Sequence, residues 1–248
     1  MDEWQRYHRN DQLDFQIYLN VKEYKSTMNV CVIGSKSFIG KNLLTINPNW
    51  RGVSREEVDF DIQKDVDAFF EHNRFDVVIH CVAYGGCRLK KDSEDVLYTN
   101  IIMFENVVRN RDKFGKMIFF SSGASKRGNP PIDPYGLAKW LIDKRIETLP
   151  NVYSLCIWAC YGPHEIPKRF SAICRKEGHI VIPQDKYFDF VDVEDVKKKV
   201  LEYCESGGPK FWNLVYPEKK KLSEWATFFG ATYTIEQEGL GEPYISSN

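Results

Sequence analysis

Residues 28–44 read MNVCVIGSKSFIGKNLL, and this stretch decides the fold expected for the chain. Residues 29–33 are a short apolar run rich in β-branched side chains that stops at Gly34, which is typical of a buried strand. A helix is expected to follow directly, over about residues 37–45. A strand that passes through a glycine turn into a helix is the usual beginning of a βαβ unit.

The same alternation continues along the chain. Further strands are expected near residues 50–54, 76–82, 117–121 and 153–159, and helices near 63–73, 93–112 and 134–149. Alternating strands and helices need crossover connections, which are right-handed and place the strands in parallel. The pattern therefore predicts an α/β protein with a Rossmann-type doubly wound parallel sheet and helices on both faces.

Composition and charge exclude several classes of function. The chain has 248 residues, with 34 basic and 35 acidic side chains, so nothing in its net charge favours nucleic acid or an anionic membrane. No apolar stretch approaches the roughly 20 residues that span a bilayer. The seven cysteines form no C-x-x-C pair and no metal-site spacing. We therefore expect no metal, buried free thiols and a reducing, cytoplasmic location.

The turn after the first expected strand has the pattern of a phosphate-binding loop. Gly34, Ser37 and Gly40 stand in the spacing G-x-x-S-x-x-G at the start of a helix, where unpaired backbone N–H groups favour a pyrophosphate. Ser37 replaces the usual middle glycine, so its hydroxymethyl group must point away from the phosphates. The motif predicts a dinucleotide site, with a purely structural turn as the alternative.

The end of the second expected strand bears on the choice of dinucleotide. An acidic residue there holds the ribose 2′-hydroxyl of NAD, and a basic residue accommodates the 2′-phosphate of NADP. Arg55 follows this strand, and Lys36 lies in the loop. Glu56 and Glu57 come next and compete for the same cations. These residues favour NADP as the cofactor, with NAD as the alternative. If Arg55 has no role in binding, it is an ordinary solvent-exposed arginine.

Candidate catalytic residues follow the expected strand at 117–121. Ser121 and Ser122 end this strand, where ligands gather in open α/β sheets. Tyr135 and Lys139 are four residues apart just after Pro134, so they share one face of a helix. An ammonium beside a phenol is expected to lower the phenol pKa, which suits a general acid or base. A Tyr-x-x-x-Lys pair alone is also common as a surface pair.

In this order, the motifs resemble those of the extended short-chain dehydrogenase/reductase family, in its NAD-dependent epimerase/dehydratase branch. The resemblance covers about residues 28–215 and is closest to the nucleotide-sugar reductases of the dTDP-4-dehydrorhamnose reductase and GDP-fucose synthase types. The supporting segments are MNVCVIGSKSFIGKNLL, FDVVIHCVA, YTNIIMFENVV, FFSSGA, PYGLAK, CYGP and FDFVDVEDV.

The resemblance implies a role for each matched residue. Tyr135 would be the general acid or base, Lys139 would bind the nicotinamide ribose and tune Tyr135, and Ser122 would hydrogen-bond the reacting sugar oxygen. Other implied cofactor contacts are Gly34, Ser37, Phe38, Ile39, Gly40, Arg55, Asp61, Ile62, Ala83 and Asn100, with Asp61 and Ile62 beside the adenine. Lys168 and Arg169 would hold the substrate diphosphate, or else form an exposed helix end.

Departures from the family pattern reduce the number of activities that the resemblance implies. No Asp-Glu pair follows Ser122, which counts against sugar dehydration, and Gly123 stands where epimerising fucose synthases carry a cysteine. The resemblance therefore implies an NADP(H)-dependent reductase of a 4-keto nucleotide-diphosphate sugar. A nucleotide-sugar 4-epimerase with tightly bound NAD is the first alternative, and a catalytically idle dinucleotide-binding protein is the second.

The expected domain division follows from the same motifs. Residues 1–27 are a polar extension that the chemistry is not expected to need, residues 28–160 form the dinucleotide-binding Rossmann domain, and residues 161–248 form a small substrate-binding lobe that partly returns to the first domain. Family members pair through two long helices, here 93–112 and 134–149, so a homodimer is possible. Their apolar side chains could equally face the sheet.

Overall fold

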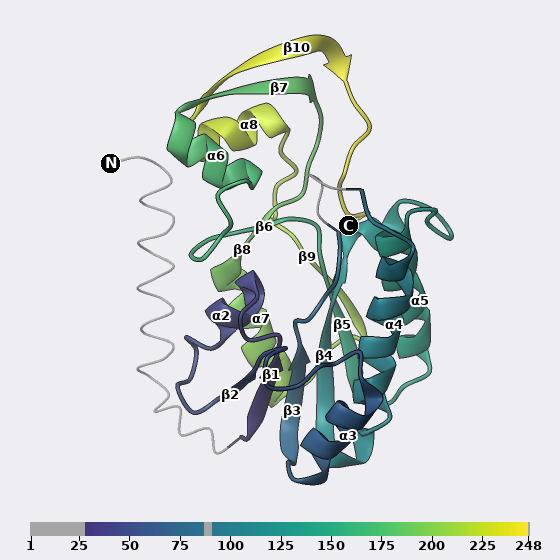
Figure 1. Ribbon diagram of the computed structural model, residues 1–248. Helices are drawn as coiled ribbons and strands as arrows, with labels where there is room; N and C mark the ends of the chain where they lie inside the picture. Colours follow the sequence, from purple (N-terminus) through teal and green to yellow (C-terminus); the bar gives the residue numbers. More distant parts are fainter. Residues whose placement is uncertain (1–27, 87–90, 248) are drawn as a thin grey trace.

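The computed structural model describes residues 28–86 and 91–247 (Figure 1). The expected N-terminal extension, residues 1–27, and Cys87 lie outside these described residues. The other six cysteines are free thiols; five are buried, and Cys81 is partly buried. Within the described ranges, no helix combines the length and apolar character needed to cross a membrane, and no three potential metal ligands gather at one point.

Six parallel strands form the central sheet, in the order β2-β1-β3-β4-β5-β9. The expected doubly wound parallel sheet is confirmed. Its strands are β1 (Val30–Ile33), β2 (Arg51–Val53), β3 (Phe75–His80), β4 (Phe114–Ser122), β5 (Val152–Ile157) and β9 (Phe211–Leu214).

Helices cover both faces of this sheet (Figure 1). One face packs against α3 (Gln63–Glu71), α4 (Asp95–Val108) and α5 (Pro134–Glu147), and the other against α2 (Phe38–Leu43) and α7 (Val193–Glu205). Two short 3-10 helices, Arg111–Lys113 and Gly123–Lys126, precede and follow β4. The strands are buried on both faces, which explains their nearly continuous apolar sequences.

The strand order reverses beside β1. From β1 the chain adds β2 on one side, then crosses back to place β3 on the other side. Loops that leave the carboxyl ends of β1 and β3 therefore diverge, and open α/β sheets bind their ligands in the crevice formed there. The topology alone thus places a binding site above β1 and β3.

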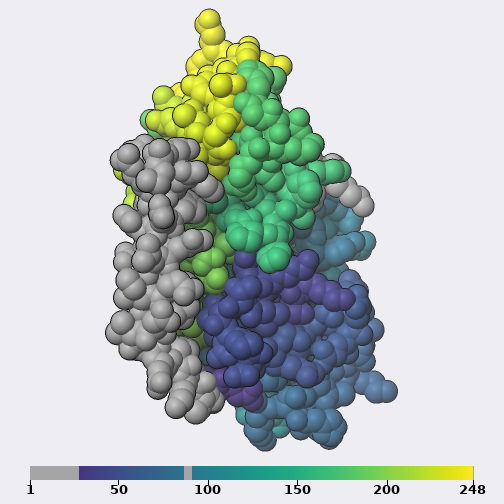
Figure 2. All heavy atoms as spheres, turned by 90° about the vertical axis from the view of Figure 1, so that its left-hand side faces the viewer, coloured from purple at the N-terminus to yellow at the C-terminus, as the bar shows by residue number. Residues whose placement is uncertain are grey.

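A smaller lobe lies above the carboxyl ends of the strands (Figure 1). It contains α6 (Phe170–Glu177), α8 (Leu222–Phe228) and a two-stranded parallel sheet of β7 (His179–Asp185) and β10 (Thr232–Leu240). A cluster of aromatic rings around the fully buried Trp225 forms its core. In Figure 2 the atoms of this lobe sit directly above those of the first βαβ unit.

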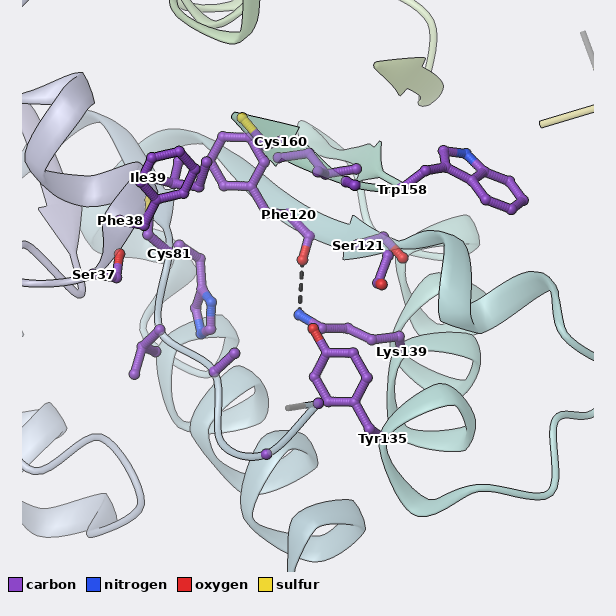
Figure 3. Close-up of a pocket in the computed structure, with 18 of the residues that line it drawn as sticks. Ser37, Phe38, Ile39, Cys81, Phe120, Ser121, Tyr135, Lys139, Trp158 and Cys160 are labelled. Atoms are coloured by element: carbon purple, nitrogen blue, oxygen red, sulfur yellow. Dashed lines mark hydrogen bonds between the residues drawn. The ribbon is translucent and has the colours of Figure 1, made fainter. Parts of the chain in front are cut away.

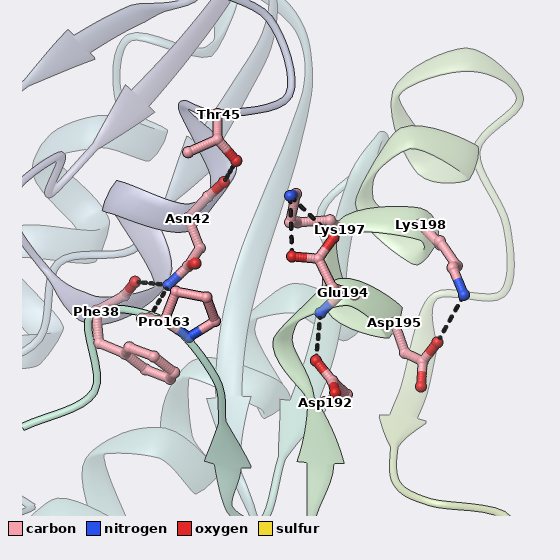
Figure 4. Close-up of polar contacts among 9 residues, drawn as sticks. All are labelled: Phe38, Asn42, Thr45, Pro163, Asp192, Glu194, Asp195, Lys197 and Lys198. Atoms are coloured by element: carbon pink, nitrogen blue, oxygen red, sulfur yellow. Dashed lines mark hydrogen bonds and ion pairs between the residues drawn. The ribbon is translucent and has the colours of Figure 1, made fainter. Parts of the chain in front are cut away.

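The region after residue 160 belongs to both parts of the molecule. A short pair of strands, β6 (Cys160–Tyr161) and β8 (Val191–Asp192), leads out of and back toward the sheet, and α7 and β9 then complete it. Asp192 caps α7, because its side chain accepts a hydrogen bond from the backbone N–H of Glu194 at 2.9 Å (Figure 4).

Asn42 ties the lobe to the phosphate-loop helix (Figure 4). Its side chain is 2% exposed, and its Nδ2 donates to the carbonyl oxygens of Phe38 and Pro163, each at 2.8 Å. A buried amide that loses such a partner costs more than the bond itself contributes. The segment leading into α6 is therefore fixed relative to α2.

Candidate active site

A pocket of about 300 Å³ opens at the carboxyl ends of β1, β3, β4 and β5 (Figure 3). The loop after β1 and the start of α2 form one side, and α5 forms the opposite side. Its lining includes Ser37, Phe38, Ile39, His80, Ala83, Phe120, Ser121, Ser122, Arg127, Tyr135, Lys139, Trp158, Cys160, Arg169 and Tyr244.

Two glycines of the phosphate loop leave no room for a side chain. A Cβ on Gly34, whose φ is +84°, would lie 2.7 Å from the backbone nitrogen of Val82, and a Cβ on Gly40 would lie 2.3 Å from the carbonyl oxygen of Gly34. β1, α2 and the segment after β3 therefore meet with their backbones in close contact. This close turn is what a dinucleotide pyrophosphate requires, so the residues present fit a dinucleotide.

Ser37 serves as the cap of α2. Its hydroxyl accepts a hydrogen bond from the N–H of Gly40 at 3.0 Å, so the hydroxyl is turned back toward the helix. Phe38 and Ile39 follow at the first turn and line the pocket (Figure 3). Ser37, at the middle position of the motif, is therefore the N-cap of α2.

Tyr135 and Lys139 project from α5 toward the end of β4 (Figure 3). Asp133 caps this helix by accepting the N–H of Gly136 at 2.8 Å, so the helix starts immediately before Tyr135. The Lys139 Nζ is buried, donates to the carbonyl oxygen of Phe120 at 2.7 Å, and lies 5.7 Å from the centre of the Tyr135 ring. The ammonium and phenol are therefore held close together.

Burial controls the pKa values of this pair. Burial raises the pKa of Tyr135 to about 12, and the hydrogen bond with Ser122 opposes this rise only in part. The phenol pKa therefore lies above its ordinary value, whereas a lowered value was expected from the neighbouring Lys139. Burial also lowers the pKa of Lys139 to about 8, against the attraction of the Asp143 carboxylate. At neutral pH the phenol is protonated and the lysine is mostly charged.

The two serines at the end of β4 have different partners. The Ser121 hydroxyl donates to the buried carboxylate of Asp143 at 2.8 Å, and Ser154 donates to the same carboxylate at 2.7 Å. The Ser122 side chain hydrogen-bonds Tyr135 and accepts from the N–H of Ala124 at 3.2 Å. Of the two hydroxyls, that of Ser122 is the one placed beside the phenol.

The cations expected to choose the dinucleotide are engaged with acids. Arg55 lies 3.2 Å from carboxylate oxygens of both Asp59 and Asp61, and Lys36 pairs with Glu56. The neighbouring Asp59 carboxyl raises the pKa of Asp61, which indicates crowded negative charge around Arg55. A 2′-phosphate would have to displace at least one of these carboxylates from the guanidinium.

The remaining expected cofactor residues fall into two groups. Ala83 lines the pocket, whereas Asp61 and Ile62 lie outside its lining, and Asp61 pairs with Arg55. Asn100 is buried, and its amide is committed to the backbone of Tyr84: it accepts the Tyr84 N–H at 3.1 Å and donates to the Tyr84 carbonyl at 2.7 Å. Asn100 therefore holds the loop after β3 rather than facing the pocket.

Lys168 and Arg169 are separated by the structure. Lys168 is exposed and does not line the pocket. Arg169 lines it, donates to the carbonyl oxygen of Cys160 at 3.0 Å and stacks on Phe38, with its Cζ 4.8 Å from the ring centre. Arg169 alone of the two is placed to meet an anion in the pocket.

The pocket residues missed by the sequence reasoning include His80, Arg127, Trp158 and Tyr244. The position of His80 at the end of β3 could have identified it, since ligands collect at strand ends. Both of its ring nitrogens are buried without a hydrogen-bond partner, and burial lowers its pKa to about 3. The imidazole is therefore neutral. Tyr244 gave no signal, because it lies far along the chain from every motif.

The chain belongs to the NAD dependent epimerase/dehydratase family, whose model matches residues 30–214. This confirms the expected family. A comparison with curated proteins found no match.

Solved structures share the fold at low sequence identity. A dTDP-4-dehydrorhamnose reductase from Bacillus anthracis in complex with NADP is 18% identical, with a TM-score of 0.74 and 84% of each chain covered. A GDP-L-fucose synthetase from Naegleria fowleri bound to NADP is 14% identical, with a TM-score of 0.69 over 88% of this chain and 84% of that one. A UDP-glucose 4-epimerase from Thermotoga maritima is 19% identical, with a TM-score of 0.70 over 86% and 87%.

The Asp143 carboxylate should control the titration of Lys139. Replacing Asp143 with Asn removes a negative charge that raises the pKa of Lys139, so the midpoint should move from about 8 to a lower pH. Nitrogen NMR of side-chain-labelled lysines in the folded protein measures it directly. Glu147→Gln, an exposed change on the same helix, is the control and should leave the midpoint in place. An unchanged midpoint in Asp143→Asn would refute the coupling.

Proposed function

We propose that the protein is an NADPH-dependent reductase of a 4-keto nucleotide-diphosphate sugar. The observation that carries this proposal is the placement of Tyr135 in the pocket at the end of β4, with Ser122 in the same lining and the Lys139 Nζ 5.7 Å from the centre of the Tyr135 ring. Reduction of a ketone needs an acid that gives a proton to the developing alkoxide. A phenol with a raised pKa starts in the form that reduction requires.

Each of the three residues has a defined part in this mechanism. The hydroxyls of Ser122 and Tyr135 hydrogen-bond the carbonyl oxygen of the sugar and fix its orientation. Bound NADPH supplies the hydride that reduces the carbonyl carbon. Tyr135 donates its Oη proton to the oxygen, and the Lys139 ammonium, fixed by the Phe120 carbonyl, stabilises the phenolate left behind.

Several observations support the substrate and cofactor classes. Arg55 and Lys36 stand near the end of β2, where a 2′-phosphate is bound in this fold. Arg169 offers a guanidinium to a diphosphate. The similar reductase and synthetase structures were solved with NADP.

A nucleotide-sugar 4-epimerase with tightly bound NAD is the second candidate. The similarity to a UDP-glucose 4-epimerase favours it, and the carboxylates around Arg55 suit a cofactor without a 2′-phosphate. Both activities use Ser122, Tyr135 and Lys139, so these residues do not separate them. Net consumption of NADPH does. An idle dinucleotide-binding protein would show neither activity.

We also propose that the protein forms a homodimer through α4 and α5. Its proposed location is the cytoplasm. Tyr98 and Leu141 are exposed on these two helices, at 69% and 37%, whereas Phe104 is fully buried against the sheet and offers nothing to a partner. The free cysteines of the described residues support a reducing compartment.

Replacing Tyr135 with Phe tests the proposed chemistry. The ring still packs, but the proton is lost, so kcat for NADPH oxidation with a 4-keto nucleotide sugar should fall by about 10²-fold to 10⁴-fold. The Kd for NADPH, measured by cofactor fluorescence, should stay within about twofold of wild type. A variant that keeps more than about a tenth of the wild-type kcat would show that Tyr135 is not the acid.

Replacing Arg55 with Ala tests the cofactor assignment. A charge-assisted contact to a 2′-phosphate exists only with NADPH, so this variant should weaken NADPH by about tenfold or more and NADH far less. Arg51→Ala is the matched control, because Arg51 pairs with Glu57 in the same segment. Equal weakening of both cofactors, or tighter binding of NADH by the wild type, would favour NAD and the epimerase.

A further inference from the structure

The C-terminal segment, residues 241–247, returns from the lobe to the active site. Figure 1 shows it descending from the end of β10 to the carboxyl ends of the sheet strands near α5. It carries Tyr244, which lines the pocket together with Ser122 and Tyr135. A residue only four positions from the end of the printed sequence thus belongs to the wall of the catalytic pocket.

A buried ion pair fastens this segment. The carboxylate of Asp189 is 2% exposed and accepts hydrogen bonds from the Nζ of Lys219 at 2.7 Å and from the N–H of Ser246 at 2.6 Å. Lys219 also donates to the Ser246 hydroxyl at 2.7 Å. Releasing the segment would leave the buried carboxylate short of a partner, which is costly.

Backbone hydrogen bonds fix Tyr244 itself. Its N–H donates to the carbonyl oxygen of Tyr187 at 2.9 Å, and its carbonyl oxygen accepts the N–H of Asp189 at 2.9 Å. The segment therefore pairs in parallel with residues 187–189, through a β-bridge between Phe188 and Tyr244. The side chain of Tyr244 is directed by this pairing.

The Tyr244 ring is part of an aromatic wall. It packs edge-on against Trp158, with ring centres 4.9 Å apart, and in a tilted arrangement against Phe188, with ring centres 5.0 Å apart. The guanidinium of Arg127 lies over the same ring, 5.4 Å from its centre. Tyr244 also acts electrostatically on Tyr135, whose pKa it helps to raise.

Gly123 shows how closely this wall approaches the catalytic serine. A Cβ on Gly123 would lie 2.3 Å from Trp158 Cε3 and 2.9 Å from Tyr244 Oη. No side chain fits at the position directly after Ser122 unless Trp158 and Tyr244 move. The Tyr244 hydroxyl therefore stands within reach of a group held by Ser122.

We propose that Tyr244 is a substrate-contacting residue that binds the sugar ring and determines which sugars the pocket accepts. Its ring offers an apolar surface to the C–H groups of a pyranose, and its hydroxyl offers a hydrogen bond to a ring substituent. This proposal rests on the proposed nucleotide-sugar substrate. In this proposal the C-terminal segment contacts the sugar, and other residues bind the nucleotide and the cofactor.

Binding measurements separate a sugar contact from a nucleotide contact. Wild type, Tyr244→Ala and Tyr244→Phe are titrated by calorimetry, with saturating NADP⁺, against GDP-mannose, UDP-glucose and dTDP-glucose and against the free nucleoside diphosphates. Tyr233→Ala, which changes an exposed tyrosine of β10 outside the pocket lining, is the control. Circular dichroism and melting temperature establish that each variant is folded.

The expected result is a loss confined to the sugar. Tyr244→Ala should weaken the best-bound nucleotide sugar by about tenfold and its free nucleoside diphosphate by less than about twofold. Tyr244→Phe should weaken the sugar by about threefold, and Tyr233→Ala should change neither ligand. If Tyr244→Ala does not fold, Tyr244→Phe decides the matter.

Three other results are distinguishable. No weakening, or equal weakening of the sugar conjugate and the free diphosphate, would overturn the role of Tyr244 while leaving the proposed function intact. Binding of nucleotide sugars without any NADPH oxidation on their 4-keto forms would refute the reductase, and the titrations would still decide the role of Tyr244. Failure of the wild type to bind any nucleotide sugar would contradict both proposals.

Discussion

The backbones of β1, α2 and the segment after β3 meet at Gly34 with no space for a Cβ on either Gly34 or Gly40. The loop is thereby tight enough for α2 to start directly above the sheet, beside the point where the strand order reverses. The Asn42 side chain of α2 donates a hydrogen bond to the Pro163 carbonyl oxygen and so fixes the lobe relative to α2. The phosphate-loop side of the pocket and the placement of the lobe both depend on this one contact between backbones.

The opposite side of the pocket depends on burial. Partial removal from water raises the pKa of Tyr135 and lowers that of the buried Lys139, and the buried Asp143 limits the fall of the lysine pKa. The Phe120 carbonyl fixes Lys139 at the end of β4. The result is a protonated phenol beside a charged lysine, an arrangement suited to donating a proton. Access of water would weaken both effects.

The sequence predicts the parts of this site that rest on local patterns. Strand and helix alternation, the glycine spacing and the Tyr135–Lys139 spacing are local, and the fold and the family expected from them are confirmed. Other features depend on residues that are distant in sequence but close in space. These are the ion pairs of Arg55, the different partners of Ser121 and Ser122, and the pKa of Tyr135. Tyr244 depends on a segment that returns across the whole lobe, which no local pattern records.

Transfer of label from the cofactor to the sugar distinguishes a reductase from an epimerase. The wild-type protein is incubated with NADPH carrying deuterium at the transferable position and a 4-keto nucleotide sugar, and the sugar product is analysed by mass spectrometry. A reductase places one deuterium on the reduced carbon and oxidises one NADPH for each product formed. An isomerised sugar that carries no deuterium, formed without consumption of NADPH, would contradict the proposed reductase and show that the site returns its hydride to the substrate.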